Sequence, residues 1–195
     1  KAVYLDMDGT ALGPDLRVRP ATTKALGELR ACGGLVGIAS GRTLEQLQPF
    51  LPAIRPNLPL VVLNGGVVVE PDGRRARTLG QLSPSVAAAA LNAMAARRNL
   101  LGLVVHFVSS AVAYPETAAF AHYLALSNIV PTKTCRTVEA CLETLAALRP
   151  REPIVKMMVV VDKASTSIEA ANLRDRIGQE ARVIGGYQGV IEVIP

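Results

Sequence analysis

The sequence predicts an α/β protein in which an open parallel sheet is followed by a separate α+β unit. Up to residue 66, short apolar runs alternate with helical patterns, and each run ends in polar or glycine residues. From residue 67 onward, hairpin patterns with helices between them replace this alternation. With 195 residues, of which 50% are apolar, the chain is long enough to bury a core in each part.

The first strand is expected at residues 2–5, an apolar run that ends in the acidic segment Asp6 to Thr10, with the sequence DMDGT. A helix of about three turns should follow, because Pro20 suits the first helical position and apolar residues recur at helical spacing from there. Gly33 and its neighbouring glycine end this helix.

A second strand is expected at residues 35–39, directly before Ser40-Gly41-Arg42. Thr43 and Gln46, three residues apart, form a capping box that opens a helix. We expect that helix to end at one of the two prolines that follow, since proline breaks a helix interior. A third apolar run, residues 60–63, ends in Asn64-Gly65-Gly66.

Three apolar strands with helices between them predict right-handed crossovers and a parallel sheet. In such a sheet, ligands bind beyond the carboxyl ends of the strands. The polar residues at those ends are Asp6, Asp8, Ser40, Arg42 and Asn64. The sequence therefore predicts that these side chains converge on one ligand site.

The second part of the chain is expected to contain hairpins and helices in alternation. The expected strands are 67–70 with 75–79, 103–108 with 111–114, 154–161, and 182–184 with 190–194; the expected helices are 83–98, 116–126, 138–148 and 165–178. Pro71-Asp72-Gly73 is the turn of the first hairpin.

Asp6 and Asp8 lie two residues apart, so both carboxylates should point to the same side of the strand. One carboxylate can attack phosphorus and form an acyl-phosphate, while the second protonates the leaving alcohol and later activates water. Two carboxylates would repel a phosphate unless a hard cation such as Mg²⁺ were bound. The plainer interpretation is an Asp-rich turn with no catalytic role.

These motifs resemble those of the haloacid dehalogenase-like hydrolases, in particular the Cof-type branch of sugar-phosphate phosphatases. Asp6 to Thr10 is similar to the first motif of that family, residues 39–42 to its second motif, and Asn64 to Gly66 to a segment at the exit into an inserted cap. The resemblance implies Asp6 as nucleophile and Asp8 as general acid and base, with the Asp6 carboxylate and the Asp8 backbone carbonyl on Mg²⁺.

The resemblance also implies a Rossmann-like parallel core, incomplete in this chain, with an inserted α+β cap. The expected boundaries are 1–66 for the N-terminal part of the core, 67–193 for the cap and 194–195 for the start of the return to the core. The expected phosphate-binding residues are Thr10, Ser40, Gly41, Arg42 and Asn64. Lys156, which interrupts an apolar strand of the cap, is expected to reach the substrate.

The function predicted from these residues is Mg²⁺-dependent hydrolysis of small phosphomonoesters such as sugar phosphates, the reaction of a phosphoric monoester hydrolase. The family's later lysine and its Gly-Asp motif are not found among residues 1–195, so this chain by itself is expected to be inactive. Two alternatives stay open: a non-catalytic or degenerate module that binds a phosphorylated ligand, and a phosphomutase of the same superfamily.

The composition predicts a cytoplasmic protein without membrane or nucleic-acid partners. The net charge is +5, but the basic residues are scattered and the chain has no Trp and few other aromatics, which a single-strand binder would use for stacking. No apolar run reaches membrane-spanning length. The three cysteines are widely spaced and odd in number, which argues against a disulfide framework or a zinc site. The sequence indicates no oligomeric state.

Overall fold

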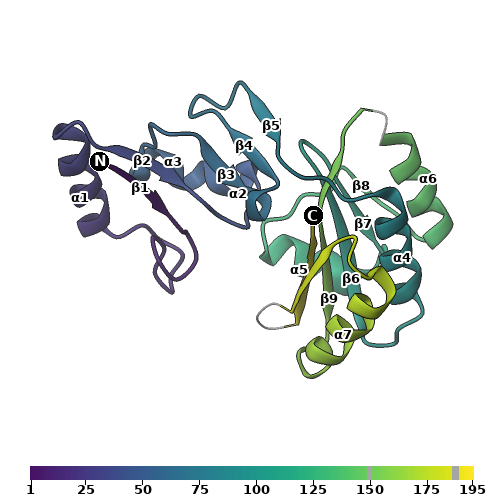
Figure 1. Ribbon diagram of the computed structural model, residues 1–195. Coiled ribbons are helices and arrows are strands. Elements are labelled where there is room, and N and C mark those ends of the chain that lie inside the picture. The colour runs from purple at the N-terminus through teal and green to yellow at the C-terminus, as the bar shows by residue number, and fades with distance from the viewer. Residues whose placement is uncertain (149–150, 186–188) are drawn as a thin grey trace. The chain divides into compact units, whose positions relative to one another are not determined.

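A computed structural model shows the protein as two compact units, Lys1–Leu79 and Gly80–Pro195. It describes residues 1–148, 151–185 and 189–195. Figure 1 labels most of the helices and strands of both units. Each unit has its own strands and its own helices.

Unit 1 begins with a parallel strand pair, as the sequence predicts. Strand β1 (Ala2–Leu5) pairs in parallel with β2 (Leu35–Ile38), and helix α1 (Pro20–Ala31) connects the two strands. Pro20 occupies the first turn of α1, where its missing N–H costs no hydrogen bond. Strand β3 (Leu60–Val62) continues this arrangement through a parallel bridge between Ala39 and Val61.

The segment between β2 and β3 is helical for longer than the sequence predicts. The capping box of Thr43 and Gln46 is confirmed and opens α2 (Leu44–Leu47). Helix α2 ends at Leu47, two residues before Pro49, which agrees with the prediction, but a 3₁₀ turn (Gln48–Phe50) and α3 (Leu51–Ile54) continue the helical segment past both prolines. Each proline lies in the first turn of the next helical segment, where proline is tolerated.

The hairpin predicted around residues 71–73 is confirmed. Strands β4 (Val67–Val69) and β5 (Ala76–Thr78) are antiparallel, and β4 also pairs antiparallel with β3. By its contacts this hairpin belongs to unit 1, whose boundary at Leu79 lies beyond the position expected after Gly66. The division into a core of 1–66 and a cap of 67–193 stays a prediction.

Unit 2 contains one mixed sheet with the strand order β10-β11-β9-β6-β7-β8. Its strands are β6 (Leu100–Phe107), β7 (Ala111–Tyr114), β8 (Lys133–Thr134), β9 (Ile154–Val161), β10 (Arg182–Gly185) and β11 (Val190–Ile194). The pairing is antiparallel except between β7 and β8. The sequence predicts five of these strands but not β8, because two residues carry no periodicity.

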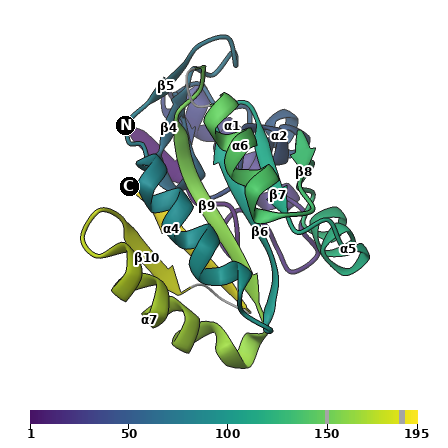
Figure 2. The same cartoon turned by 90° about the vertical axis from the view of Figure 1, so that its right-hand side faces the viewer.

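Helices cover this sheet unequally, as the turned view in Figure 2 shows. The larger core lies between one face and the helices α4 (Pro84–Ala95), α6 (Val138–Leu148) and α7 (Thr166–Ile177). On the other face, α5 (Ala118–Leu126) packs Phe120 and Leu124 against a smaller cluster that includes Val104 and Met158. Alternate residues of β6 and β9 thus enter different cores, as the two-residue period of a strand requires.

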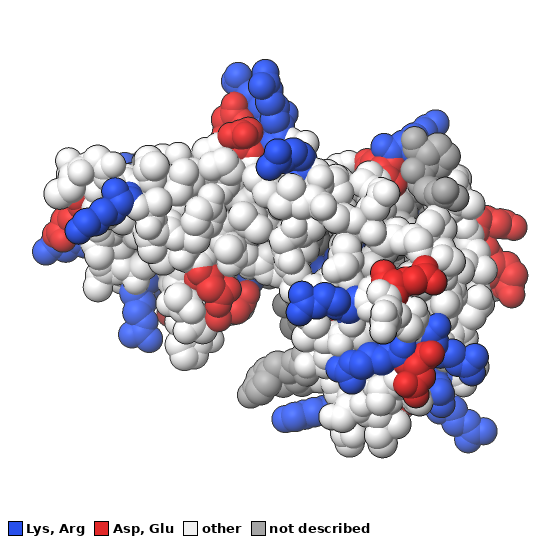
Figure 3. Space-filling view, in the orientation of Figure 1, with Lys and Arg blue, Asp and Glu red and all other residues white. Residues whose placement is uncertain are grey.

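The surface gives no sign of one large basic region on the face shown in Figure 3, where acidic and basic side chains are dispersed among uncharged ones. None of the helices in the described part of the chain has the length and apolar character needed to cross a membrane.

Candidate functional site

The segment after β1 exposes two carboxylates on either side of a buried residue. Met7 is fully buried, whereas Asp6 and Asp8 are exposed, which agrees with the predicted alternation. The loop folds back on itself, because Ala11 N donates to Asp6 O (3.1 Å) and Leu12 N donates to Met7 O (2.8 Å). Gly9 makes this turn with a positive φ of 77°, a conformation that glycine adopts without steric cost.

Thr10 lies within reach of the predicted nucleophile. Its hydroxyl Oγ1 is 3.4 Å from Asp6 Oδ2, a long hydrogen bond. Thr10 and Asp6 are both exposed, so this contact leaves the Asp6 carboxylate open to solvent.

The strongest side-chain interaction of this region joins the ends of β1 and β2. Arg42 donates two parallel hydrogen bonds to the Asp8 carboxylate, from Nε to Oδ2 (2.9 Å) and from Nη2 to Oδ1 (2.7 Å). Such a fork fixes both the position and the plane of a carboxylate. The predicted convergence of these two strand ends is therefore present in the structure.

This pair changes the acid–base properties of both partners. The hydrogen bonds and the charge of Arg42 hold the pKa of Asp8 below its usual value, although partial burial acts in the opposite direction. The same hydrogen bond raises the pKa of Arg42. Asp8 is therefore a carboxylate at neutral pH in the free protein.

Arg42 is itself held in place by its surroundings. Its side chain is only 17% exposed, and its guanidinium carbon lies 5.4 Å from the centre of the Phe50 ring. Its backbone N donates to Ser40 Oγ (3.2 Å), and its backbone carbonyl accepts from Leu63 N (3.0 Å). The fork that holds Asp8 is thus anchored on its own side by packing and hydrogen bonds.

The end of β3 carries local backbone strain. Leu63 and Asn64 both have positive φ, 52° and 57°, a conformation that is uncommon for residues other than glycine. Asn64 N donates to Ser40 O (3.3 Å), which ties this turn to the end of β2. Consecutive left-handed residues cost about 1–3 kcal/mol each and persist where the surroundings require them, often at functional sites.

Gly41 and Asn64 are close neighbours in this arrangement. A side-chain carbon added at Gly41 would lie 3.1 Å from Asn64 Oδ1, so the amide of Asn64 approaches the backbone there. Ser40 is buried, with 7% of its surface exposed, and its N–H donates to Val61 O (2.9 Å). The structure therefore brings Ser40, Gly41 and Asn64 together at the ends of β2 and β3.

The oxygen donors on this loop suit a hard cation. The Asp6 carboxylate is exposed and the Asp8 carbonyl lies two residues on, while the described residues contain no group of three or more His, Cys, Asp or Glu that would form a complete metal site. Mg²⁺ commonly binds through one or two carboxylates, retained waters and substrate phosphate. The donor set thus fits Mg²⁺ in kind.

Lys156 lies in unit 2, where the structure gives it an unforeseen partner. It is 4% exposed in β9 and pairs with the carboxylate of Glu192 in β11. His106 of β6 is its cross-strand neighbour and is 5% exposed. Sequence reasoning missed Glu192, although a single acidic residue inside an apolar strand was a signal, because it mirrors the single lysine of β9.

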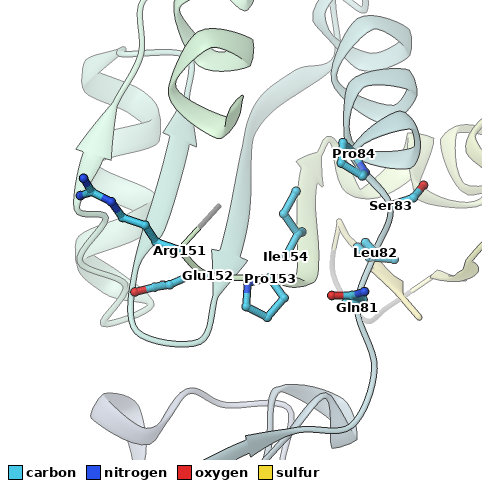
Figure 4. A pocket seen from close by; sticks show the side chains of 8 residues that line it. All are labelled: Gln81, Leu82, Ser83, Pro84, Arg151, Glu152, Pro153 and Ile154. Atoms are coloured by element: carbon cyan, nitrogen blue, oxygen red, sulfur yellow. The ribbon is translucent and has the colours of Figure 1, made fainter. Parts of the chain in front are cut away.

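Two pockets formed by described residues, one in each unit, contain none of the predicted site residues. In unit 2 an open pocket of about 350 Å³ is lined by Gln81, Leu82, Ser83, Pro84, Arg151, Glu152, Pro153 and Ile154 (Figure 4). Glu152 there bonds to the hydroxyls of Ser109 and Ser110, so it is already satisfied. A pocket in unit 1, about 310 Å³, lies between α2, α3 and the β4–β5 turn. The predicted carboxylates lie instead on an exposed loop.

Residues 3–195 match a protein-family model that is described as haloacid dehalogenase-like hydrolase. A search of curated proteins found no match. Solved structures, in contrast, share the fold over the whole chain.

A haloacid dehalogenase-like hydrolase from Bacteroides thetaiotaomicron superposes with a TM-score of 0.79 at 16% identity, covering 100% of this chain and 71% of that one. A HAD/COF-like protein from Plasmodium vivax gives 0.76 at 21% identity, covering 100% and 68%. A structure described as a HAD subclass IIB sugar phosphatase gives 0.74 at 16% identity, covering 100% and 69%. At these identities the likeness establishes the fold.

Proposed function

The chain belongs to the haloacid dehalogenase-like hydrolases, and on this premise we propose that it hydrolyses small phosphomonoesters through an aspartyl-phosphate on Asp6. The observation that carries the proposal is the bidentate pair between Arg42 and Asp8. This pair holds the Asp8 carboxylate, two residues from Asp6, and links it to the end of β2, where Ser40 lies. Nucleophilic catalysis by a carboxylate requires this kind of partner, which handles the protons of the leaving alcohol and of the attacking water.

In the first step, an oxygen of the exposed Asp6 carboxylate attacks phosphorus and the bond from phosphorus to the ester oxygen breaks. Asp8 delivers a proton to that oxygen, so the product leaves as a neutral alcohol. Because Arg42 holds the pKa of Asp8 low, the proton has to arrive with the substrate. A phosphomonoester can bring it as the monoanion, since its second pKa is about 6.

In the second step, the Asp8 carboxylate takes a proton from water as the water oxygen attacks phosphorus. The bond between phosphorus and the Asp6 oxygen breaks, which restores the Asp6 carboxylate and releases phosphate. Asp8 is ionised, so its carboxylate can accept this proton.

The phosphoryl oxygens are proposed to lie near the ends of β2 and β3. Ser40, Gly41 and Asn64 are neighbours there, and the Thr10 hydroxyl lies on the Asp6 side. Hydroxyl, amide and backbone N–H donors placed before the reaction stabilise charge as it develops on phosphorus. The strained Leu63–Asn64 turn supports a functional reason for this placement.

Mg²⁺ is the proposed cofactor, with the Asp6 carboxylate and the Asp8 carbonyl as its ligands from this chain. When bound, it neutralises the phosphate charge that the two carboxylates would otherwise repel. Both donors are oxygens on one short loop, which is the type of ligand that Mg²⁺ prefers.

The proposed substrates are sugar phosphates or similar small metabolites. A solved structure with the same fold is described as a sugar phosphatase, which supports this class. Lys156 stays a proposed substrate contact in unit 2, because an ammonium group can donate hydrogen bonds to the oxygen atoms of a substrate; in the structure it is buried and paired with Glu192.

The proposal is tested by assaying the product of the complete reading frame, beside residues 1–195, on a panel of sugar phosphates with Mg²⁺. Quenching in acid during turnover should trap a phosphoryl group on the peptide that contains Asp6, detected by mass spectrometry. Turnover without any trapped phosphopeptide, and retained by Asp6→Asn, would show that the nucleophile is assigned wrongly. No turnover of any phosphomonoester would refute the proposed reaction.

A further inference from the structure

Arg42 meets Asp8 with the edge of its guanidinium group that carries Nε and one terminal nitrogen. The two contacts, 2.9 and 2.7 Å, are both within the range of strong charge-assisted hydrogen bonds. The Asp8 side chain is 56% exposed, so little else in unit 1 limits its rotation. The guanidinium fork is therefore the main restraint on the orientation of this carboxylate.

The two partners differ in how firmly the fold holds them. The Arg42 side chain is 17% exposed and lies against the Phe50 ring, while its backbone is hydrogen-bonded to Ser40 and Leu63. Asp8 belongs to an exposed loop with a glycine at the next position. The rigid partner is thus the arginine, and the carboxylate takes its position from it.

We infer that Arg42 is a positioning residue that acts through Asp8 by fixing the carboxylate for proton transfer, rather than a residue that holds the phosphoryl group. This inference rests on the proposed function and refines it. Two of the three guanidinium nitrogens are already committed to Asp8. Binding a phosphoryl oxygen with that same edge would release the carboxylate that has to transfer the protons.

The two roles predict different results when Arg42 is replaced: they differ in how the fall in kcat/KM depends on the leaving group of the ester. A positioned acid matters most for a basic leaving group, because a good leaving group departs without a proton. A residue that binds the phosphoryl group contributes similarly to every ester, since the phosphoryl group is the same in all of them. The dependence on the ester therefore separates positioning from phosphate binding.

The experiment is a double-mutant cycle of Arg42→Gln and Asp8→Asn in the product of the complete reading frame. Turnover is measured on p-nitrophenyl phosphate, phenyl phosphate and glycerol 1-phosphate, in order of rising leaving-group basicity. We expect Arg42→Gln alone to lower kcat/KM a few-fold on the first ester and by about 10²-fold on the last. In the Asp8→Asn background the same substitution should change kcat/KM less than about twofold.

An equal loss on all three esters, or an undiminished loss in the Asp8→Asn background, would overturn the inference.

A second readout does not depend on turnover. Calorimetry with inorganic phosphate should give the same affinity for Asp8→Asn with and without Arg42→Gln. A loss of about tenfold or more would identify Arg42 as a phosphate ligand. A protein that hydrolyses no phosphomonoester would refute the proposed function, whereas one that hydrolyses all three esters with the same loss in Arg42→Gln would refute this inference and leave the proposed function standing.

Two further variants separate a local effect from a folding defect. Arg42→Lys keeps the positive charge but cannot form the fork, so it should keep phosphate affinity while remaining as slow as Arg42→Gln on glycerol 1-phosphate. Arg77→Gln changes an exposed arginine of β5 and should leave all measured constants unchanged. Thermal unfolding by circular dichroism confirms that each variant is folded. Full rescue of turnover by lysine would contradict the positioning role.

Discussion

Lys156 in the central strand β9 is paired with Glu192 in the neighbouring strand β11, and the lysine is buried while the glutamate side chain is 21% exposed. Both side chains belong to the sheet face that also carries Met158 and Val190, so an ion pair lies at the margin of an apolar cluster. A charge buried in this way is costly unless its counter-ion stays in place.

We therefore predict that Glu192→Gln destabilises unit 2 by roughly 2–4 kcal/mol, because it removes the carboxylate that compensates a buried ammonium group. Lys156→Met should destabilise unit 2 by less, since the carboxylate of Glu192 that remains is more exposed to water than the Lys156 ammonium group. The double variant Lys156→Met/Glu192→Leu should recover most of the loss. Urea unfolding followed by circular dichroism measures all three, and an unchanged midpoint for Glu192→Gln would contradict the prediction.

Stability should fall in mild acid because of His106. Burial, assisted by the charge of Lys156, lowers the pKa of His106 to about 3. Between about pH 6.5 and pH 3 the unfolded chain therefore binds a proton that the folded chain does not, so folding stability decreases as the pH falls below 6.5. At pH 5.5 the expected loss relative to pH 7.5 is about 1 kcal/mol.

The variant that tests this is His106→Gln, which should abolish the difference in urea midpoint between these two pH values. His122→Gln, at an exposed position of α5, is the matched control and should retain it. If both variants keep the pH dependence, another group causes it.

Asp6→Asn should lower turnover by at least about 10³-fold, because an amide is a poor nucleophile and a weaker Mg²⁺ ligand. Asp8→Asn should be severe on sugar phosphates but milder on p-nitrophenyl phosphate, whose leaving group needs no proton. Asp15→Asn, an exposed neighbour in the same region of the chain, should stay near wild type. Steady-state rates with the product of the complete reading frame provide the measurement.

Removal of divalent cations should stop hydrolysis without unfolding the protein. Chelation is expected to remove turnover, and added Mg²⁺ should restore it, because the two residues proposed to bind Mg²⁺, Asp6 and Asp8, are exposed at the surface. Circular dichroism before and after chelation checks that the fold persists. Full activity in excess chelator would rule out the proposed cofactor.

Gly102 in β6 should tolerate no side chain, because an added carbon would overlap the Phe120 ring of α5. Gly102→Ala is expected to destabilise unit 2 by about 1–3 kcal/mol through overpacking. Gly27→Ala is the contrasting change: Gly27 lies inside α1 with open space around it, so alanine should stabilise that helix by up to about 1 kcal/mol. The thermal unfolding midpoint should fall for Gly102→Ala and rise for Gly27→Ala.

Local patterns in the sequence predicted most of the secondary structure. The capping box of Thr43 and Gln46 and the turn at residues 71–73 were readable because each depends on residues close in the chain. The same holds for the alternation of Asp6, Met7 and Asp8, which predicted two exposed carboxylates around a buried methionine. The family motifs gave these residues their expected chemistry.

Contacts between distant residues could not be read in this way. The sequence indicated Arg42 as a phosphate ligand, but only the tertiary structure places its guanidinium group against Asp8, because that contact depends on how β1 and β2 pair. The partnership of Lys156 with Glu192 likewise depends on the register of β9 and β11. By itself the sequence determined which residues are polar at the strand ends, since composition and spacing are local properties. Which of those groups neutralise one another was decided by strand pairing, a non-local property that no single segment encodes.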